Sequence, residues 1–311
     1  MPETYAAALI LTAAPGSNAL GPETLAVART CLARYDIIGD RTLATGEAHE
    51  FLVVIPETTD LAAIRRALAS GLATPAVDVN IIPNDITWTR RKLLVADMES
   101  TIIEQEMLDE LGDFIGKRAE IEDITARAMR GELDFEGALK SRVSLLAGLP
   151  ETVLDDVARR ITYMPGAAAL VTTMKANGAY CALVSGGFTV FTGRVAARLG
   201  FDEHRANVLE TADGRLTGTV RSPILGRQAK LDALNELTTK LGLFPQQTLA
   251  VGDGANDLAM IGAAGLGVAF RAKPKVRDEA ASLDNGAVVT NGDLTALLHL
   301  QGYARSDFRS A

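Results

Sequence analysis

The sequence predicts an α/β protein: a doubly wound, mostly parallel Rossmann-like sheet with a helical cap insertion, preceded by a ferredoxin-like α+β domain. Two apolar runs, at residues 93–96 and 248–251, each end at an acidic cluster. Strands of a parallel sheet that is buried on both faces are uninterrupted apolar runs, and ligands bind beyond their carboxyl ends. Strand and helix patterns then alternate from residue 167 onward, which favours a doubly wound core.

The chain has 311 residues, more than a single domain usually contains, so two domains are expected. We place the first at residues 1–84. Its patterns predict strands at 5–12, 37–43, 51–55 and 77–82 and helices at 22–35 and 61–69. The order β-α-β-β-α-β is that of a ferredoxin-like module. Because this part carries no cluster of polar chemistry, we expect it to be regulatory or dimerising rather than catalytic.

The second domain, residues 85–311, begins with the strand at 93–96 and continues with helical patterns until residue 162. The apolar faces of these helices consist of Ile103, Met107 and Leu111, of Ile121, Ile124 and Ala128, and of Phe135, Leu139, Val143 and Leu146. We therefore predict a helical cap at about residues 103–160, inserted after the first strand.

The remaining chain alternates between strands and helices. Strands are predicted at 180–184, 248–251, 268–270 and 287–289, helices at 167–176, 189–199, 228–241 and 255–263, and a hairpin of 206–210 with 215–220 around Asp213-Gly214. This alternation supplies the strands of the parallel sheet and the helices that cover its two faces.

Composition and charge exclude several classes of partner. The net charge of −8 argues against binding to duplex nucleic acid. No apolar stretch approaches the about 20 residues of a membrane span, and Met1-Pro2-Glu3-Thr4 lacks the basic residues of a signal peptide. Cys31 and Cys181 are far apart, and Cys181 lies in an apolar run, so reduced thiols are expected. We expect a cytoplasmic protein without nucleic-acid or membrane partners.

The first acidic cluster pairs Asp97, at the end of the run at 93–96, with Glu99 two residues later. In extended backbone the two side chains fall on the same face. A carboxylate at a strand end beside a metal activates water or attacks phosphorus directly, and a nucleophile and a proton donor suit this spacing. An acidic pair in an ordinary loop is the alternative, and the pair alone does not exclude it.

Two other positions suit a phosphate group. Ser185-Gly186-Gly187 follows the strand at 180–184 and precedes a helix, where glycine lets the backbone approach a ligand and the helix N-terminus offers free N–H donors. Lys230 begins the helix at 228–241, where it can pair with phosphate and with Asp97 as a fixed cation. A plain strand-to-helix turn and a surface lysine are the alternatives.

The most specific segment is Gly252-Asp253-Gly254-Ala255-Asn256-Asp257, directly after the second apolar run. Carboxylates a few ångströms apart need a cation or a proton to neutralise them. Mg²⁺ prefers a few carboxylates and waters, so Asp253 is a candidate ligand, and Asn256 and Asp257 are candidates for holding waters, substrate or Lys230. The three histidines of the chain are scattered, which argues against zinc.

The order Asp97-x-Glu99-x-Thr101, Ser185, Lys230, Gly252-Asp253-Gly254-x-x-Asp257 resembles the haloacid dehalogenase superfamily of phosphotransferases. More narrowly, the portion from about Arg91 to His299 resembles the phosphoserine phosphatase family. The matching segments are Asp97-Met98-Glu99-Ser100-Thr101 with Glu106, Met129-Arg130-Gly131-Glu132-Leu133-Asp134-Phe135, Arg142-Val143-Ser144-Leu145-Leu146, Ser185-Gly186-Gly187-Phe188 and Gly252-Asp253-Gly254-Ala255-Asn256-Asp257. Residues 1–84 resemble the ACT-like domain that some members carry, at the level of fold only.

The resemblance implies a Mg²⁺-dependent enzyme that hydrolyses O-phospho-L-serine to L-serine and phosphate through an aspartyl-phosphate intermediate, the last step of L-serine biosynthesis. The expected binding partner of such an enzyme is a small-molecule substrate. Whether the protein also forms a homodimer is left open. Two other functions are open as well. The first is a related phosphotransferase or a phosphatase for another small metabolite, because the insertion sets the substrate. The second is a catalytically decayed amino-acid sensor, which the occupied polar positions disfavour.

The resemblance also implies a role for each matched residue. The implied catalytic residues are Asp97 as nucleophile, Glu99 as general acid and base, and Lys230; the substrate-binding residues are Glu106, Phe135, Arg142, Ser185, Gly186 and Asn256; Thr101 and Asp257 support them; and the metal ligands are Asp97, Glu99 through its backbone carbonyl, and Asp253. Glu106 and Arg142 suit the ammonium and the carboxylate of a zwitterion. One position departs from the family pattern, which has aspartate where this chain has Glu99, so the backbone or the rotamer must absorb an extra methylene.

Overall fold

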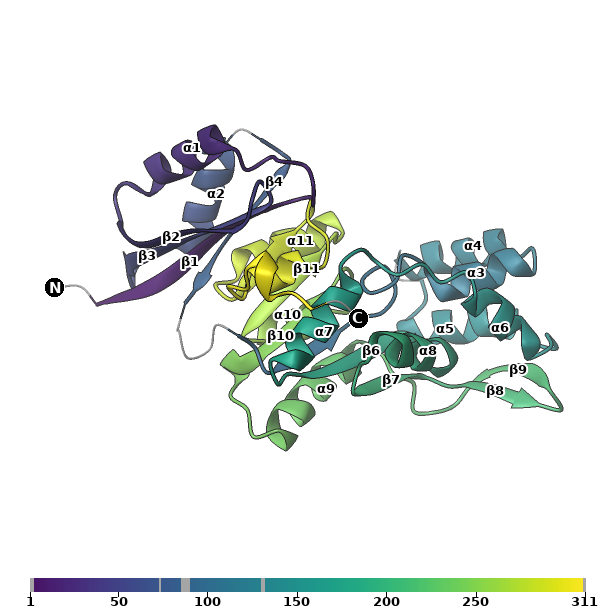
Figure 1. The fold of residues 1–311 in the computed structure, drawn as a ribbon. Helices are drawn as coiled ribbons and strands as arrows, with labels where there is room; N and C mark the ends of the chain where they lie inside the picture. The colour runs from purple at the N-terminus through teal and green to yellow at the C-terminus, as the bar shows by residue number, and fades with distance from the viewer. Residues whose placement is uncertain (1–2, 73, 85–89, 130–131, 310–311) are drawn as a thin grey trace.

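The computed structural model describes residues 3–72, 74–84, 90–129 and 132–309 (Figure 1). In these ranges the strands form a four-stranded sheet, a six-stranded sheet and a two-stranded hairpin. Within the same ranges, no helix combines the length and the apolar character needed to span a bilayer. Arg130 and Gly131 of the matched cap segment lie outside the described residues, as does the chain just after the predicted domain boundary at residue 84.

The first sheet is antiparallel and has the strand order β2-β3-β1-β4. Its elements are β1 (Thr4–Ala13), α1 (Pro22–Leu32), β2 (Asp36–Ala44), β3 (Ala48–Pro56), α2 (Leu61–Leu72) and β4 (Val77–Pro83). Successive side chains of a strand face opposite ways, so Leu9 and Leu11 pack under α1 and α2 while Ala8 and Ile10 face the rest of the protein. The ferredoxin-like prediction is confirmed. The ACT-like resemblance, the regulatory or dimerising role and the boundary at residue 84 stay predictions.

The second sheet is parallel and has the order β12-β11-β10-β5-β6-β7. Its strands are β5 (Leu93–Ala96), β6 (Tyr180–Phe188), β7 (Glu203–Asn207), β10 (Thr248–Gly252), β11 (Leu266–Phe270) and β12 (Gly286–Val289). The strand of this sheet that comes first in the sequence, β5, therefore lies in the interior of the sheet, and the strand order reverses between β5 and β10. In doubly wound sheets ligands bind at this reversal, beyond the carboxyl ends of the strands.

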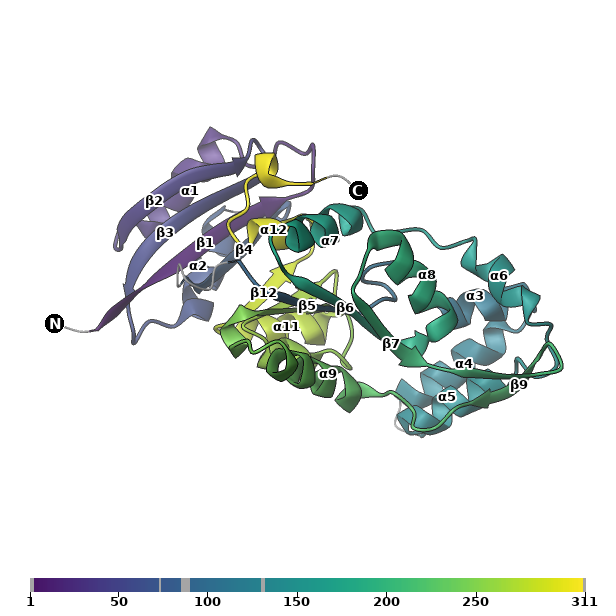
Figure 2. The same cartoon turned by 60° about the horizontal axis from the view of Figure 1, so that its bottom comes forward.

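Helices cover both faces of this sheet (Figure 2). One face carries α7 (Ala167–Ala176), α8 (Thr189–Leu199) and α12 (Ala296–His299), and the other carries α9 (Arg227–Lys240), α10 (Leu258–Ala263) and α11 (Pro274–Ser282). Strand β5 serves both layers: Leu94 and Ala96 join the core on the α7 side, and Leu93 and Val95 pack with α9. All four residues are fully buried, which explains why the run contains no polar side chain.

The cap follows β5 and lies at the end of the molecule remote from the first sheet (Figure 1). It consists of α3 (Met107–Phe114), α4 (Arg118–Met129), α5 (Phe135–Ser144) and α6 (Thr152–Ala158), and the hairpin β8 (Leu209–Ala212) with β9 (Arg215–Val220) packs against α5. Short 3-10 turns lie at Pro245–Gln247 and Arg305–Asp307. The predicted extent of the cap, about residues 103–160, stays a prediction.

Several predicted element boundaries differ from the structure, among them the start of the helix predicted at 255–263, which begins at Leu258, and three of the differences have identifiable reasons. The first cap helix begins at Met107, because Ile103 instead forms a bridge with Tyr163. The hairpin begins only at Leu209, because β7 before it joins the parallel sheet as an edge strand. Strand β6 continues to Phe188, beyond the predicted turn, with a shift in its register against β7.

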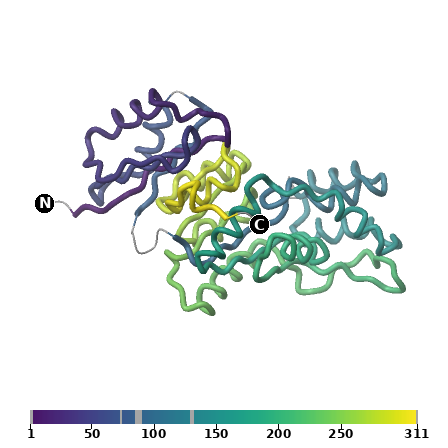
Figure 3. Tube along the Cα trace, viewed as in Figure 1, coloured from purple at the N-terminus to yellow at the C-terminus, as the bar shows by residue number. Residues whose placement is uncertain are grey.

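The two sheets are joined along their edges and by the C-terminal segment. Asn80 of β4 donates to the Val288 carbonyl of β12 at 2.9 Å and accepts from the Val288 N–H at 2.8 Å. The chain after α12 then runs beside the first sheet (Figure 3), where the Gly302 carbonyl accepts a hydrogen bond from Arg41 at 3.1 Å. These contacts attach the first sheet to the α/β core on the side away from the cap.

Candidate active site

The two acidic clusters meet at the reversal of the parallel sheet. Asp97 follows β5 directly, and Asp253 follows β10 directly. The two strands are hydrogen-bonded neighbours, and the Asp97 N–H continues their pairing by donating to the Val251 carbonyl at 3.0 Å. The convergence predicted from the two apolar runs is thus present in the structure.

Lys230 forms ion pairs with a carboxylate of each acidic cluster. It lies in the first turn of α9, and its Nζ is 2.7 Å from Asp97 Oδ1 and 2.6 Å from Asp257 Oδ1. Burial favours a neutral amine, but the two carboxylates outweigh it and hold the pKa of Lys230 above its usual range. The surface-lysine alternative is therefore wrong: Lys230 is 1 % exposed and sits beneath the acidic site.

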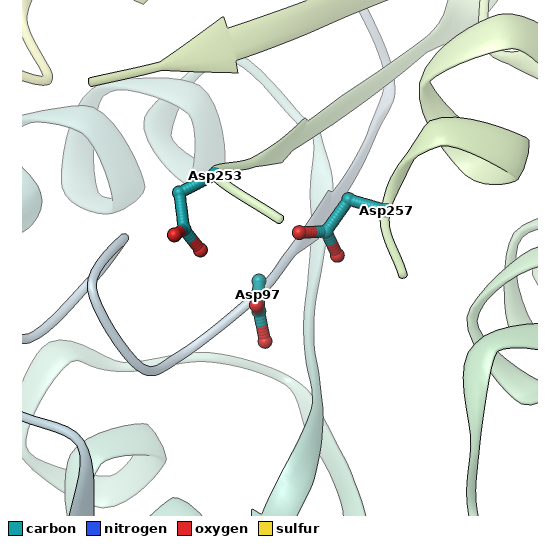
Figure 4. Close-up of side chains that lie close together, drawn as sticks. All are labelled: Asp97, Asp253 and Asp257. Atoms are coloured by element: carbon teal, nitrogen blue, oxygen red, sulfur yellow. The ribbon is translucent and has the colours of Figure 1, made fainter. Parts of the chain in front are cut away.

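The acidic cluster can hold a cation. Carboxylate oxygens of Asp97, Asp253 and Asp257 all lie within 4.8 Å of one another, and Figure 4 shows the three side chains converging. Burial raises the pKa of Asp97 to about 8, with Lys230 opposing the shift, and burial followed by the charge of Asp257 raises the pKa of Asp253 to about 6. The group therefore needs a neutralising charge, and its oxygen-only donors fit a hard divalent metal ion.

Asp257 has less freedom than the other two to bind a metal. One oxygen accepts from Lys230 and the other accepts from the Gly254 N–H at 3.0 Å. Asp97, in contrast, uses Oδ1 for both Lys230 and the Met98 N–H, which leaves Oδ2 for a ligand. The geometry assigns Asp257 to positioning Lys230 and the Gly252–Asp257 loop, and leaves Asp97 and Asp253 to face the cavity.

Glu99 follows Asp97 by two residues and contacts the first helix of the cap. Its Oε1 accepts a hydrogen bond from the Met107 N–H at 2.8 Å, at the start of α3. Burial, followed by the charge of Glu106, raises the pKa of Glu99 to about 8. A carboxyl group whose pKa lies near neutrality is suited to act as a proton donor and then as an acceptor.

One cavity of about 440 Å³ connects the sheet edge to the cap. Its walls include seven of the predicted site residues besides Asp97, namely Glu99, Glu106, Phe135, Arg142, Gly186, Asp253 and Asn256. The remaining predicted residues do not line it: Thr101, Ser185, Lys230 and Asp257 are buried beneath its floor. The hydroxyl oxygen of Thr101 has no hydrogen-bond partner among the described residues.

The cap contributes groups of opposite charge to this cavity. Glu106 accepts a hydrogen bond from Ser100 Oγ at 2.8 Å. Arg142 donates to the Ala138 carbonyl at 3.3 Å and lies 3.5 Å from Thr125 Oγ1, and burial lowers the pKa of its guanidinium. The two residues provide one anionic and one cationic contact within a single chamber.

The Ser185–Gly187 segment is held differently from the prediction. It belongs to the irregular end of β6 rather than to a helix N-terminus, and α8 begins only at Thr189. Ser185 Oγ accepts from the Gly187 N–H at 2.9 Å, and Asn207 at the end of β7 donates to the Gly186 carbonyl at 2.8 Å. Asn207 thereby positions the segment, a role that its isolated place in the sequence did not indicate.

Sequence reasoning also missed Asp109 and Lys273, which line the cavity. Asp109 lies three residues after Glu106, so the helical spacing of the two acids was an available signal. Lys273 follows β11, whose carboxyl end lies at the same sheet edge as Asp97 and Asp253, so its place after an apolar run was a signal of the same kind.

Comparison with known proteins agrees with this geometry. Residues 94–262 match the family model of the haloacid dehalogenase-like hydrolases. Phosphoserine phosphatase SerB2 of Mycobacterium tuberculosis is 41% identical over 245 residues, which cover 79% of this chain and 59% of that protein. A phosphoserine phosphatase of Polaromonas sp. is 45% identical, over 73% of this chain and 97% of the relative.

A solved structure extends the similarity to both sheets. The crystal structure of a probable phosphoserine phosphatase from Vibrio cholerae, in its unliganded form, superposes with a TM-score of 0.75 at 33% identity, covering 97% of this chain and 88% of that one. The agreement covers the antiparallel sheet as well as the α/β core. The chain belongs to the phosphoserine phosphatase family of the haloacid dehalogenase-like hydrolases.

Proposed function

We propose that this protein is a Mg²⁺-dependent phosphoserine phosphatase that converts O-phospho-L-serine and water to L-serine and phosphate. The observation that carries the proposal is the shared cavity, whose floor presents Asp97 and Asp253 while its cap side presents Glu106 and Arg142. A phosphoryl group at the floor then leaves the serine moiety among the cap residues. There Glu106 faces the ammonium group and Arg142 faces the carboxylate, with Phe135 covering the chamber.

In the first half-reaction the free oxygen of Asp97 attacks phosphorus. The Asp97–phosphorus bond forms as the bond from phosphorus to the serine oxygen breaks, and Glu99 gives its proton to that leaving oxygen. Lys230 favours the attack because, at 2.7 Å, its charge opposes the effect of burial on the pKa of Asp97 and so stabilises the ionised, nucleophilic form. Ser185 and Gly186, beside the same cavity, hold the phosphoryl oxygens in this proposal.

In the second half-reaction water attacks the phosphorus atom of the aspartyl phosphate. Glu99, now ionised, takes a proton from that water, and the bond between phosphorus and Asp97 breaks. Phosphate leaves, while Asp97 returns to its carboxylate form and Glu99 to its protonated form. Each group therefore ends the cycle as it began, as a catalyst must.

The proposed Mg²⁺ site consists of Asp97, Asp253 and the backbone carbonyl of Glu99, with Asn256 and Asp257 in support. The oxygen-only donors and the raised pKa values of Asp97 and Asp253 support a divalent cation there. When bound, Mg²⁺ supplies positive charge for the carboxylates and for the phosphoryl oxygens.

We also propose a reducing, cytoplasmic setting. Cys31 and Cys181 are both free thiols, and burial raises the pKa of Cys181 to about 12, which keeps that thiol protonated and unreactive.

A homodimer formed through the first sheet is a separate proposal, which sedimentation of the full chain tests.

The decisive experiment measures Mg²⁺-dependent phosphate release from a panel of phosphorylated metabolites, with and without homoserine as an acceptor. The proposal expects phosphoserine to be the best substrate and water to be the acceptor. Efficient turnover of another ester in place of phosphoserine would refute the substrate, and phosphohomoserine as the main product would identify a phosphotransferase. Asp97→Asn should abolish the beryllofluoride adduct that mimics the phosphoenzyme, and retention of that adduct would remove Asp97 as nucleophile.

A further inference from the structure

Glu99 is connected to the cap as well as to the phosphoryl site. Helix α3 begins at Met107, and Glu106 at its N-cap position makes no capping hydrogen bond with its own side chain. The Met107 N–H instead donates to Glu99 Oε1 at 2.8 Å. A helix N-terminus leaves its first N–H groups without partners inside the helix, so the Glu99 carboxylate acts as a cap supplied from the catalytic loop.

A second hydrogen bond runs between the same two segments. Ser100 Oγ donates to Glu106 Oε1, also at 2.8 Å. Adjacent residues of the catalytic loop, Glu99 and Ser100, therefore hold adjacent residues of the cap, Met107 and Glu106. The pair of contacts fixes where the Glu106 carboxylate stands in the cavity.

The length of the glutamate side chain makes this connection possible. With aspartate the carboxylate would end about 1.5 Å closer to the backbone, one carbon–carbon bond short of its present place, and the Met107 N–H would lie beyond hydrogen-bond distance. Gly187 provides the space on the other side, because a Cβ there would lie only 2.8 Å from Glu99 Oε2. The chain thus combines a longer acid with the one residue type that leaves room for it.

We propose that Glu99 is, besides a proton donor, a positioning residue for Glu106, and that it thereby determines how strongly the enzyme selects substrates that carry an ammonium group next to the phosphate ester. This inference rests on the proposed function. In this view the departure from the family's aspartate is a specificity device. The substrate class it favours is the phosphate esters of amino acids over those of plain hydroxy acids.

The test separates the two roles by changing length and acidity in turn. Glu99→Asp keeps an acid but shortens it, and Glu99→Gln keeps the length and an acceptor oxygen but removes the proton. The measured quantity is the ratio of kcat/KM for O-phospho-L-serine to kcat/KM for 3-phosphooxypropionate, the same ester without the ammonium group. We expect this ratio to fall about tenfold in Glu99→Asp, the effect of one charge-assisted contact. In Glu99→Gln both rates should fall while the ratio stays the same.

Hydrogen exchange supplies a readout that does not depend on activity. The Met107 amide should exchange faster in Glu99→Asp than in the unchanged protein, and it should stay protected in Glu99→Gln. Gly187→Ala, which pushes the carboxylate off the helix, should reproduce the loss of selectivity if Glu99→Asp does not fold. Glu104→Asp, an equal shortening of an exposed glutamate in the same loop, is the matched control and should change nothing.

The outcomes distinguish this inference from the proposed function. An unchanged substrate ratio and an unchanged Met107 exchange rate in Glu99→Asp would overturn the positioning role while leaving phosphoserine hydrolysis intact. Failure of the unchanged protein to hydrolyse phosphoserine would overturn the proposed function, and the exchange experiment would still report whether Glu99 caps the helix.

Discussion

Lys230 Nζ lies 2.7 Å from Asp97 Oδ1, and the two side chains are only 1 % and 7 % exposed. The same ammonium group is 2.6 Å from Asp257. Water screens this arrangement little, so one cation balances two carboxylates inside the protein, and the third, Asp253, lies nearby. Among the described residues of this site, three carboxyl groups therefore face a single buried cation, Lys230.

Lys230→Met should destabilise the metal-free protein and nearly abolish activity. Loss of one partner of a buried ion pair costs about 3–5 kcal/mol, because the remaining charges are left uncompensated. Loss of a preorganised cation beside the proposed phosphoryl site should lower kcat by about 10²–10³-fold. Urea unfolding at pH 8 and steady-state kinetics measure the two effects. Lys240→Met at the exposed end of the same helix is the control, and equal behaviour of both variants would contradict the bridging role of Lys230.

The stabilising effect of Mg²⁺ should increase with pH. The pKa of Asp97 is raised to about 8 and that of Asp253 to about 6, chiefly by burial, from an ordinary 3.8. A carboxyl group with a raised pKa in the folded state holds its proton to higher pH than in the unfolded chain. Without metal, these two groups therefore favour the folded state most at low pH, and this contribution is lost as the pH rises through about 6 and about 8. Metal binding needs the ionised form and releases these protons.

Thermal unfolding of EDTA-treated protein at pH 6 and pH 8.5, with and without Mg²⁺, measures this dependence. The rise in Tm caused by Mg²⁺ should be larger at pH 8.5. Asp253→Asn should remove most of the rise, because it removes one proposed ligand. An equal rise in Tm at both pH values would show that Mg²⁺ binding does not depend on the ionisation of these carboxylates, and it would contradict the prediction.

Arg142→Lys should weaken substrate binding with little change in the chemical step. Lysine keeps the positive charge but loses the planar fork that pairs with a carboxylate through two hydrogen bonds. We expect KM for phosphoserine to rise about 10–100-fold, the effect of about 1.5–3 kcal/mol, while kcat stays within a few-fold. Arg127→Lys on the exposed face of α4 is the matched control. A fall in kcat at constant KM would place Arg142 in the chemistry instead.

Asn80→Ala should loosen the attachment of the first sheet to the α/β core. Asn80 is fully buried, and its amide satisfies both the N–H and the carbonyl of Val288. Truncation leaves these two backbone groups without their partner, at about 1–3 kcal/mol of unfolding free energy. Chemical denaturation measures the loss, with Asn235→Ala on the surface of α9 as the control. If the two variants unfold alike, the contact between the sheets contributes little to stability.

Local sequence patterns were sufficient to predict most of the element order and the acidic character of the sheet edge, although β7 was taken as part of the hairpin. Leu93–Ala96 has to be a buried strand, because four successive apolar residues fit a sheet that is covered on both faces. Once such a strand ends, the following residue emerges at the carboxyl edge, so Asp97 and Asp253 were predictable as neighbours. The ferredoxin-like order of residues 1–84 followed from local patterns in the same way.

The surroundings of those carboxylates depend on how the elements pack against one another. The sequence left Lys230 undecided between a surface side chain and an active-site cation, and only packing of α9 under the sheet buries it against Asp97 and Asp257. The contact between Glu99 and the Met107 N–H likewise depends on how the cap is placed over the sheet edge. Local patterns record which face of an element is apolar, but contacts between segments far apart in the chain depend on how those faces dock. For that reason the position of Asp97 at the sheet edge could be predicted from the sequence, whereas its charge environment could not.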